Sequence, residues 1–264
     1  MTGLSPTTIG IRSGSLIDQH HSMTPVATIR SCYSQRFGIP RQPGLVTSAL
    51  ASIEFEPSPA NRLALRGLDA FSHLWIIFVF HKHHYANPKP LVRPPRLGGR
   101  TAIGVYATRS PNRPNPIGLS AVKLEGIAFD HDKYRVRIAG GDFLDGTPVL
   151  DIKPYVPFVD AIGEATSEWA TPVESLLEVV WSDQALKQLA EVPQTGDDIL
   201  FGSSGLKTLV EETLAQDPRP AHERGKDGRP EQKWGVIVGP VDVTFRVEQG
   251  RVVVFSVVTI RAEH

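Results

Sequence analysis

The pattern of apolar and polar residues along the chain predicts many short strands and few helices. Residues 134–139 alternate cleanly, which is typical of a strand with one buried face. Residues 71–80 are continuously apolar over a strand's length, which predicts a strand buried on both faces. Further strands are expected at residues 24–32, 45–55, 101–108, 117–129 and 147–152. Because short turns join these segments, an antiparallel barrel or sandwich is favoured over a parallel Rossmann-type sheet.

The second part of the chain combines helical patterns with a hairpin. Ser182 can cap a helix over residues 183–190, and residues 199–215 carry a longer helical pattern. After a charged loop that runs to Gln232, two apolar segments flank the turn at residues 248–250. We therefore predict a mainly β protein with three regions: a mobile extension over 1–23, a β-barrel domain over 24–165 and a small α+β domain over 166–264.

Charge is distributed unevenly although the net charge is zero. Residues 19–124 hold thirteen Lys and Arg against three Asp and Glu, whereas residues 125–264 hold fourteen against twenty-four. The first block predicts a surface for a polyanion, with the basic side chains as phosphate contacts. The alternative is that the two halves neutralise each other across an interface.

Composition excludes several other classes of protein. The most apolar run, residues 74–80, is too short to span a bilayer, so no membrane role is expected. Cys32 is the single cysteine, which rules out an internal disulfide and a multi-cysteine zinc site. A reducing cytoplasm is the simplest location.

The most distinctive segment is TAIGVYATRSPNRPNPIGL, residues 101–119. Its prolines fix φ and remove backbone donors, so the arginines and asparagines between them sit on a backbone with little freedom to lose on binding. A stiff surface turn has the same composition. The local sequence leaves both interpretations open.

Polar residues also follow the predicted strands at three other places. These are PRQ at residues 40–42, the pair His81 and Lys82 in a run with His83 and His84, and DGTPVLDIKPY at residues 145–155. With the proline-rich loop they make four polar corners around apolar walls, which is what a small-ligand pocket needs. A metal role for the histidines is disfavoured, because no helical HExxH pattern accompanies them.

Several long motifs together resemble the TrmO (YaeB, TsaA-like) family of S-adenosylmethionine-dependent tRNA methyltransferases. The motifs are PRQPGLV (40–46), GLDAFSHLWIIFVFH (67–81), VRPPRLGG (92–99), ATRSPNRPNPIG (107–118), DGTPVLDIKPYVPF (145–158) and DPRP (217–220). The resemblance covers nearly all of the chain after Met23. It implies a single-sheeted antiparallel β-barrel with a smaller C-terminal domain, a homodimer, and methylation of N6 of threonylcarbamoyladenosine next to the anticodon of tRNA.

The resemblance also implies a set of residues that bind S-adenosylmethionine. They are Pro40, Arg41, Gln42, His81, Lys82, Arg109, Leu119, Asp145, Gly146, Thr147 and Pro148. An arginine pairs naturally with the methionine carboxylate. No metal is implied. His222 stands where relatives carry a tyrosine after DPRP, which puts a role for that hydroxyl in doubt.

For the reaction, alignment of the activated methyl group with the attacking nitrogen is expected to matter most. Asp145 is the candidate general base, although Asp is also favoured in such a D-G turn for its geometry alone. Arg93, Arg96, Arg113 and Asn115 are the predicted RNA contacts. The alternative function is a non-catalytic regulatory module that binds S-adenosylmethionine or RNA. A methyltransferase of small molecules is disfavoured by the basic block.

Overall fold

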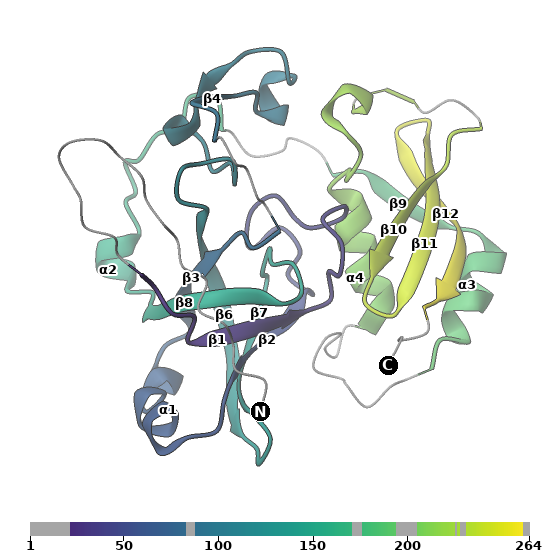
Figure 1. The fold of residues 1–264 in the computed structure, drawn as a ribbon. Coiled ribbons are helices and arrows are strands. Elements are labelled where there is room, and N and C mark those ends of the chain that lie inside the picture. Colours follow the sequence, from purple (N-terminus) through teal and green to yellow (C-terminus); the bar gives the residue numbers. More distant parts are fainter. Residues whose placement is uncertain are drawn as a thin grey trace.

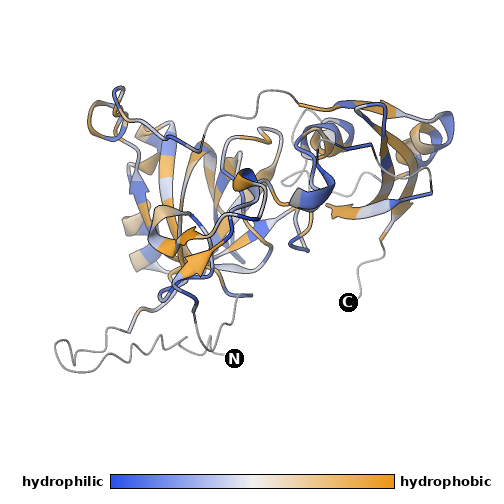
Figure 2. Cartoon of the chain, turned by 90° about the horizontal axis from the view of Figure 1, so that it is seen from above, coloured by the Kyte–Doolittle hydropathy of each residue, from blue (hydrophilic) through white to orange (hydrophobic). Residues whose placement is uncertain are grey.

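The computed structural model describes residues 22–82, 88–170, 176–193, 205–224, 226–227 and 231–260. The extension up to residue 21, His83, His84 and the predicted helix start at 199–204 lie outside the described residues. The rest forms a barrel and a smaller sheet with helices, which lie side by side (Figures 1 and 2). The predicted mainly β fold with an α+β appendage is therefore confirmed.

Six strands form a closed barrel in the order β1-β2-β7-β6-β3-β8. Every neighbouring pair is antiparallel. The strands are β1 (Ala27–Ser31), β2 (Leu50–Phe55), β3 (His73–Val79), β6 (Ile117–Phe129), β7 (Tyr134–Ala139) and β8 (Thr147–Pro154). Inward side chains such as Ile29, Ile76 and Val136 are fully buried and fill the interior.

Several short helices and strands lie in the segments outside the six barrel strands. Ser58 caps the first of them by accepting from the backbone N–H of Asn61. These elements are α1 (Pro59–Ala64), η1 (Leu68–Ala70), β4 (Leu91–Val92), η2 (Pro95–Leu97), β5 (Ile103–Gly104), η3 (Val105–Ala107) and α2 (Pro157–Asp160).

Several predicted strands are shorter than expected, and the largest differences are in residues 45–55 and 101–108. In residues 45–55 the strand begins only at Leu50, because Val46 and Ala49 pack into the core of the C-terminal sheet and Ser48 binds Glu212. In residues 101–108 only Ile103–Gly104, β5, forms a strand. The chain then turns, because the backbone N–H of Thr108 donates to the carbonyl of Val105.

The expectation that β3 is buried on both faces is wrong for its outer face. Leu74 and Ile76 are fully buried, whereas Trp75 and Ile77 are only half-buried. Helix α2 covers part of this outer face, since Trp75 Nε1 donates to Asp160 Oδ2 over 3.0 Å. The aromatic run thus supplies both the barrel core and an outer contact.

The C-terminal sheet has the order β10-β11-β12-β9, with β9 parallel to β12. The hairpin between β11 and β12 turns at Gln249 and Gly250, both with positive φ, as the E-Q-G sequence predicts. Strands β9 and β10 were not predicted. The elements are β9 (Glu178–Trp181), α3 (Asp183–Ala190), α4 (Gly205–Ala215), η5 (Ala221–Glu223), β10 (Trp234–Val238), β11 (Val241–Glu248) and β12 (Arg251–Thr259).

The loop between β1 and β2 connects the two parts of the molecule. Cys32 and Tyr33 are buried in the same core as Val243 and Leu209 of the C-terminal part. The Tyr33 hydroxyl lies 3.1 Å from Thr213 Oγ1 of α4. The C-terminal sheet is therefore held by residues that immediately follow the first barrel strand.

Candidate functional site

Barrel topology brings the predicted polar corners to one end. Strands β1, β3 and β7 run in the same direction, because each is antiparallel to its neighbours in the ring. The described parts of the loops that follow them, residues 32–49, 80–82 with 88–116, and 140–146, therefore lie at the same end of the barrel. These loops contain PRQ, the His81–Lys82 pair, the proline-rich loop and the start of DGTP.

A cavity of about 560 Å³ opens at this end, a volume typical of small-molecule sites. Eight of the eleven predicted cofactor residues line it: Pro40, Arg41, Gln42, His81, Lys82, Arg109, Leu119 and Thr147. Asp145, Gly146 and Pro148 stand outside the set of described lining residues. Gly146 is nevertheless adjacent, since a Cβ placed on it would lie 4.0 Å from His81 Nε2.

Aromatic side chains form one wall of the cavity. Trp75, Phe78 and Phe80 line it, and the ring of Phe78 meets Phe80 and Phe143 edge to face at 5.0 and 5.1 Å between centroids. Gly118, opposite Phe78 in the β3–β6 ladder, leaves room for this ring. A Cβ at Gly118 would lie 2.2 Å from the Phe78 ring, far inside van der Waals contact.

Replacing Gly118 by alanine is therefore expected to displace Phe78 and deform the cavity wall. Overpacking of this kind costs about 1–3 kcal/mol. Chemical denaturation should show that loss. The matched variant Gly104→Ala, at a position where an added Cβ meets nothing within 4 Å, should lose much less. Equal losses in the two variants would contradict the role of Gly118.

The proline-rich loop is both pinned and part of the cavity wall. Arg113 Nη1 donates to the carbonyls of Thr108 and Ser110, each over 3.1 Å. Arg109 Nη1 donates to Gln42 Oε1 and so joins this loop to the PRQ corner. The two interpretations of the loop are thus compatible, because internal hydrogen bonds stiffen the backbone that presents Arg109 to the cavity.

One carboxyl in the cavity wall, Asp142, was not singled out from the sequence. Ser120 Oγ donates to Asp142 Oδ1 over 2.6 Å. Burial raises the pKa of Asp142, whereas the hydrogen bond from Ser120 and the positive charge of Arg109 lower it. Its place in GGDFLDG, directly after a predicted strand end, was the signal that could have marked it.

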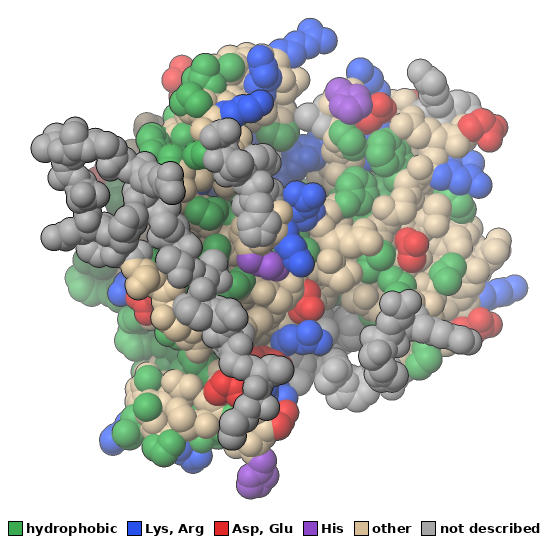
Figure 3. Space-filling model, in the orientation of Figure 1, with side chains coloured by type: hydrophobic (Ala, Val, Ile, Leu, Met, Phe, Trp, Pro, Cys, Tyr) green, Lys and Arg blue, Asp and Glu red, His purple; other side chains and the backbone are tan. Residues whose placement is uncertain are grey.

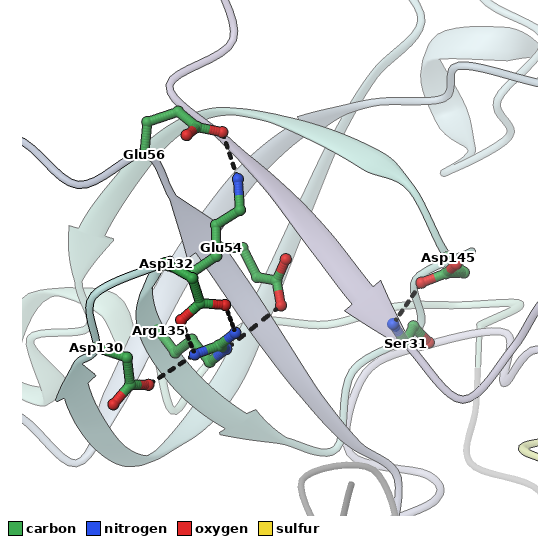
Figure 4. A network of polar contacts seen from close by, with 8 residues as sticks. Ser31, Glu54, Glu56, Asp130, Asp132, Arg135 and Asp145 are labelled. Atoms are coloured by element: carbon green, nitrogen blue, oxygen red, sulfur yellow. Dashed lines mark hydrogen bonds and ion pairs between the residues drawn. The ribbon is translucent and has the colours of Figure 1, made fainter.

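Asp145 belongs to the β7–β8 loop, and its side chain binds the backbone of Ser31 at the end of β1 (Figure 4). Its Oδ1 accepts from the N–H of Ser31 over 2.9 Å, and its Oδ2 lies 3.3 Å from Arg30 Nη1. These contacts fix the β7–β8 loop against β1. The catalytic role of Asp145 stays a prediction.

The opposite end of the barrel carries a separate ion-pair network (Figure 4). Arg135 on β7 lies 2.6 Å from Asp130, 2.8 Å from Asp132 and 3.5 Å from Glu54. Hydrogen bonds to Asp132 and Asp130 and the negative charge of Glu54 stabilise the charged guanidinium and raise the pKa of Arg135. We interpret this network as a support of the β6–β7 hairpin.

The DPRP segment contributes a buried ion pair. Arg219 is 1% exposed and binds Asp217 with two nitrogens, Nε to Oδ1 over 2.7 Å and Nη2 to Oδ2 over 2.8 Å. The segment is also electrostatically coupled to the cavity. Partial burial lowers the pKa of Arg41, the negative charge of Asp217 raises it and the positive charge of Arg96 lowers it.

Basic side chains are exposed on the long loop between β3 and β6, other residues of which line the cavity. Arg93 and Arg96 lie on the loop around β4 and η2 and are both exposed, as is Asn115. Figure 3 shows Lys and Arg side chains over the loops at the top and along the junction of the two parts. Arg113 differs from these residues, because it is half-buried and lines the cavity.

The described residues contain no group of three or more His, Cys, Asp or Glu arranged to hold a metal ion. No helix among them is long and apolar enough to cross a membrane.

Comparison with known proteins gives consistent matches along the chain. Family models described as the tRNA-methyltransferase O N-terminal domain and the TrmO C-terminal domain match residues 28–161 and 174–260. A tRNA (adenine(37)-N6)-methyltransferase of Escherichia coli is 40% identical over 88% of this chain and 95% of that protein. One of Eikenella corrodens is 43% identical over 72% and 99%. The crystal structure of TrmO from Pseudomonas aeruginosa matches with a TM-score of 0.72 at 36% identity, covering 91% of this chain and 99% of that one.

Proposed function

Because this chain belongs to the tRNA-methyltransferase O family, we propose that it transfers a methyl group from S-adenosylmethionine to N6 of adenosine 37 in tRNA, in its threonylcarbamoyl form. The observation that carries this proposal is the convergence of eight predicted cofactor residues on one cavity. The resemblance of the sequence motifs to the TrmO family is confirmed by the matching family models and relatives.

The residues of the cavity fit S-adenosylmethionine chemically. Arg109, oriented by Gln42, suits the methionine carboxylate, and the aromatic wall with Leu119 suits the adenine ring. Bound S-adenosylmethionine supplies an electrophilic methyl group on a sulfonium. The task of the surrounding residues is to hold the attacking nitrogen in line with that methyl group and to exclude water.

Asp145, Gly146 and Pro148 flank Thr147 of the proposed cofactor site without being part of the described cavity lining. Asp145 holds the loop on Ser31, and Gly146 lies next to His81. Pro148 pairs with Thr28 in the β1–β8 ladder. We propose that this segment sets the position of Thr147 in the cavity.

The tRNA is proposed to lie across the exposed basic loop beside the cavity. Arg93 and Arg96 are exposed there. Arg96 is close enough to the cavity for its positive charge to lower the pKa of Arg41. Asn115 is exposed farther along the same loop, where we propose that it contacts the nucleotides that flank the target. Arg113 binds its own loop, so its proposed contribution to RNA binding is to shape the loop between cofactor and RNA.

Replacing Arg93 and Arg96 together by glutamine is expected to weaken tRNA binding and flatten its salt dependence. Each phosphate contact contributes about 0.9 to the slope of log K against log salt concentration on duplex nucleic acid. Filter binding over a salt series should therefore show a slope smaller by about 1–2. Lys187→Gln, on an exposed position of α3, serves as the control with an unchanged slope. An unchanged slope in the double variant would place the RNA elsewhere.

We also propose that the protein is a homodimer in the cytoplasm, where its tRNA substrate occurs. Large apolar side chains on α2 and just after it are strongly exposed: Phe158 is 88%, Val159 57% and Ile162 62% exposed. Contiguous exposed apolar side chains are typical of association surfaces. They lie close to Trp75 of the cavity wall, which donates to Asp160 of the same helix.

Methyl transfer to RNA tests the proposed function. The protein is incubated with tRNA and S-adenosylmethionine that carries a labelled methyl group, and label in the RNA is measured. Label in the RNA supports the enzyme. Binding of both molecules without transfer would support the regulatory module, and transfer to small molecules without RNA would contradict the proposed substrate.

A further inference from the structure

Asp142 is the one carboxyl among the described residues that line the cavity. It is not one of the residues proposed to bind the cofactor, so its place in the cavity wall has no assigned role. It lies in the β7–β8 loop, and its partner Ser120 lies on β6, next to Leu119. Ser120 is 2% exposed, so its hydroxyl is held in place by the barrel wall. The hydrogen bond from this buried serine therefore holds the Asp142 carboxyl at the cavity wall.

The proposed reaction needs a proton acceptor in this cavity. In threonylcarbamoyladenosine N6 is a urea-type nitrogen, whose lone pair is delocalised into the carbonyl and the purine. Such a nitrogen is a poor nucleophile while it keeps its proton. A carboxylate positioned to accept that proton contributes about 10²–10⁴-fold to the rate in comparable reactions.

We infer that Asp142 is the residue that accepts the N6 proton. This inference rests on the proposed function. As the bond between N6 and the methyl carbon forms, the bond between that carbon and the sulfonium sulfur breaks. The N6 proton passes to the Asp142 carboxylate, and the sulfur keeps the electron pair as a neutral thioether. Release of the proton to solvent restores the carboxylate for the next turnover.

The contacts favour Asp142 over Asp145 for this role. Asp145 is used by Ser31 and Arg30 and stands outside the described lining of the cavity. Asp142 lines the cavity, and Ser120 holds its carboxyl there through a hydrogen bond to Oδ1. Burial raises the pKa of Asp142 above that of an exposed carboxyl, which makes the carboxylate a better proton acceptor, while Ser120 and Arg109 oppose part of this rise.

Other charged groups face the same cavity and must be separated from Asp142 in any pH study. The charged or titratable side chains among its other described lining residues are Arg36, Arg41, His81, Lys82, Arg109 and Arg113. Of these types, histidine has the ordinary pKa closest to that of a carboxyl raised by burial. The pH dependence of the rate therefore identifies Asp142 only when the titration of that carboxyl is measured independently.

The first test compares Asp142→Asn with Asp151→Asn. Asp151 is a half-buried aspartate on β8 that pairs with Lys153 over 3.0 Å, and it lies outside the described cavity lining. Single-turnover transfer to threonylcarbamoyl tRNA at saturating S-adenosylmethionine should fall about 100-fold or more in Asp142→Asn. The dissociation constants for S-adenosylmethionine and tRNA should change by less than about threefold. Asp151→Asn should leave the rate unchanged.

The second test uses Ser120→Ala and the titration of Asp142 itself. As pH falls through the pKa of Asp142 the carboxylate is protonated, so the rate should fall on the acid side. Ser120 lowers the pKa of Asp142, so without its hydroxyl that pKa rises and the acid limb should move to higher pH. Infrared difference spectra with isotope-labelled aspartate, in the protein without cofactor, should show an Asp142 carboxyl band that titrates together with the limb and is absent in Asp142→Asn.

Three results would overturn the inference. They are a near-normal rate in Asp142→Asn, a rate loss that S-adenosylmethionine affinity explains entirely, and an acid limb that does not follow the infrared titration. Failure of the proposed function is distinguishable, because then the unaltered protein itself transfers no methyl group to tRNA.

Discussion

Replacing Asp217 by asparagine is expected to lower the free energy of unfolding by about 3–5 kcal/mol, the range for removing one partner of a buried ion pair. Arg219 is 1% exposed and would keep its charge without a carboxylate partner. Asn is the suitable replacement, because Asp217 has a φ of 47° and asparagine tolerates the left-handed region as well as aspartate does. Chemical denaturation of the full chain measures the loss.

An exposed ion pair provides the matched control for Asp217→Asn. Glu248 pairs with Arg246 over 2.9 Å, and both side chains are more than 40% exposed. Glu248→Gln should therefore cost at most about 1 kcal/mol. Adding Arg219→Met to Asp217→Asn should recover part of the loss, because it removes the unpaired charge. Similar losses in Asp217→Asn and Glu248→Gln would contradict the role of the buried pair.

Replacing Arg109 by alanine is expected to weaken S-adenosylmethionine binding by about 10- to 100-fold, since hydrogen bonds to a charged group contribute about 1.5–3 kcal/mol. In the proposed site Arg109 pairs with the methionine carboxylate, and Gln42 holds its guanidinium in place. Lysine at this position should recover only part of the affinity, because it lacks the planar fork of arginine. Isothermal titration calorimetry gives the dissociation constants.

The control for Arg109→Ala is Arg100→Ala. Arg100 is exposed in the same long loop but lies outside the described cavity lining, so its removal should leave cofactor affinity unchanged. Equal effects of the two variants would indicate that Arg109 acts through general charge. An unaltered affinity in Arg109→Ala would remove it from the cofactor site.

The strands of the barrel were predictable where one face of the strand decides its pattern. Residues 134–139 alternate in the sequence and form β7 with the same bounds, and residues 183–190 likewise form α3 after the Ser182 cap. The prediction was wrong where distant packing decides the conformation. Residues 45–49 look like strand but are held by α4 through Glu212, a contact 164 residues along the chain from Ser48.

Strands β9 and β10 were missed for a similar reason. Residues 234–238 follow a charged loop and are too short to show a clear period, and β9 is a four-residue strand. Both are stabilised by pairing with the long hairpin, β10 with β11 and β9 with β12. Short edge strands of this kind depend on their neighbours more than on their own sequence.

The cavity was predictable in its corners but not in its walls. Turn-rich polar segments after strands are visible in the sequence, and the antiparallel ring brings three loops to one end. Asp142 was missed because its position depends on Ser120, which lies 22 residues earlier on another strand. Phe78 likewise reaches the wall only because Gly118 faces it across the ladder.

The most direct measurement of the central claim is methyl transfer to two tRNAs that differ only in the threonylcarbamoyl group on adenosine 37, followed by mass spectrometry of the product nucleosides. The account predicts one added methyl group, on N6 of threonylcarbamoyladenosine, and none in the tRNA that lacks the group. Equal methylation of both tRNAs, or a methyl group on another position, would contradict it.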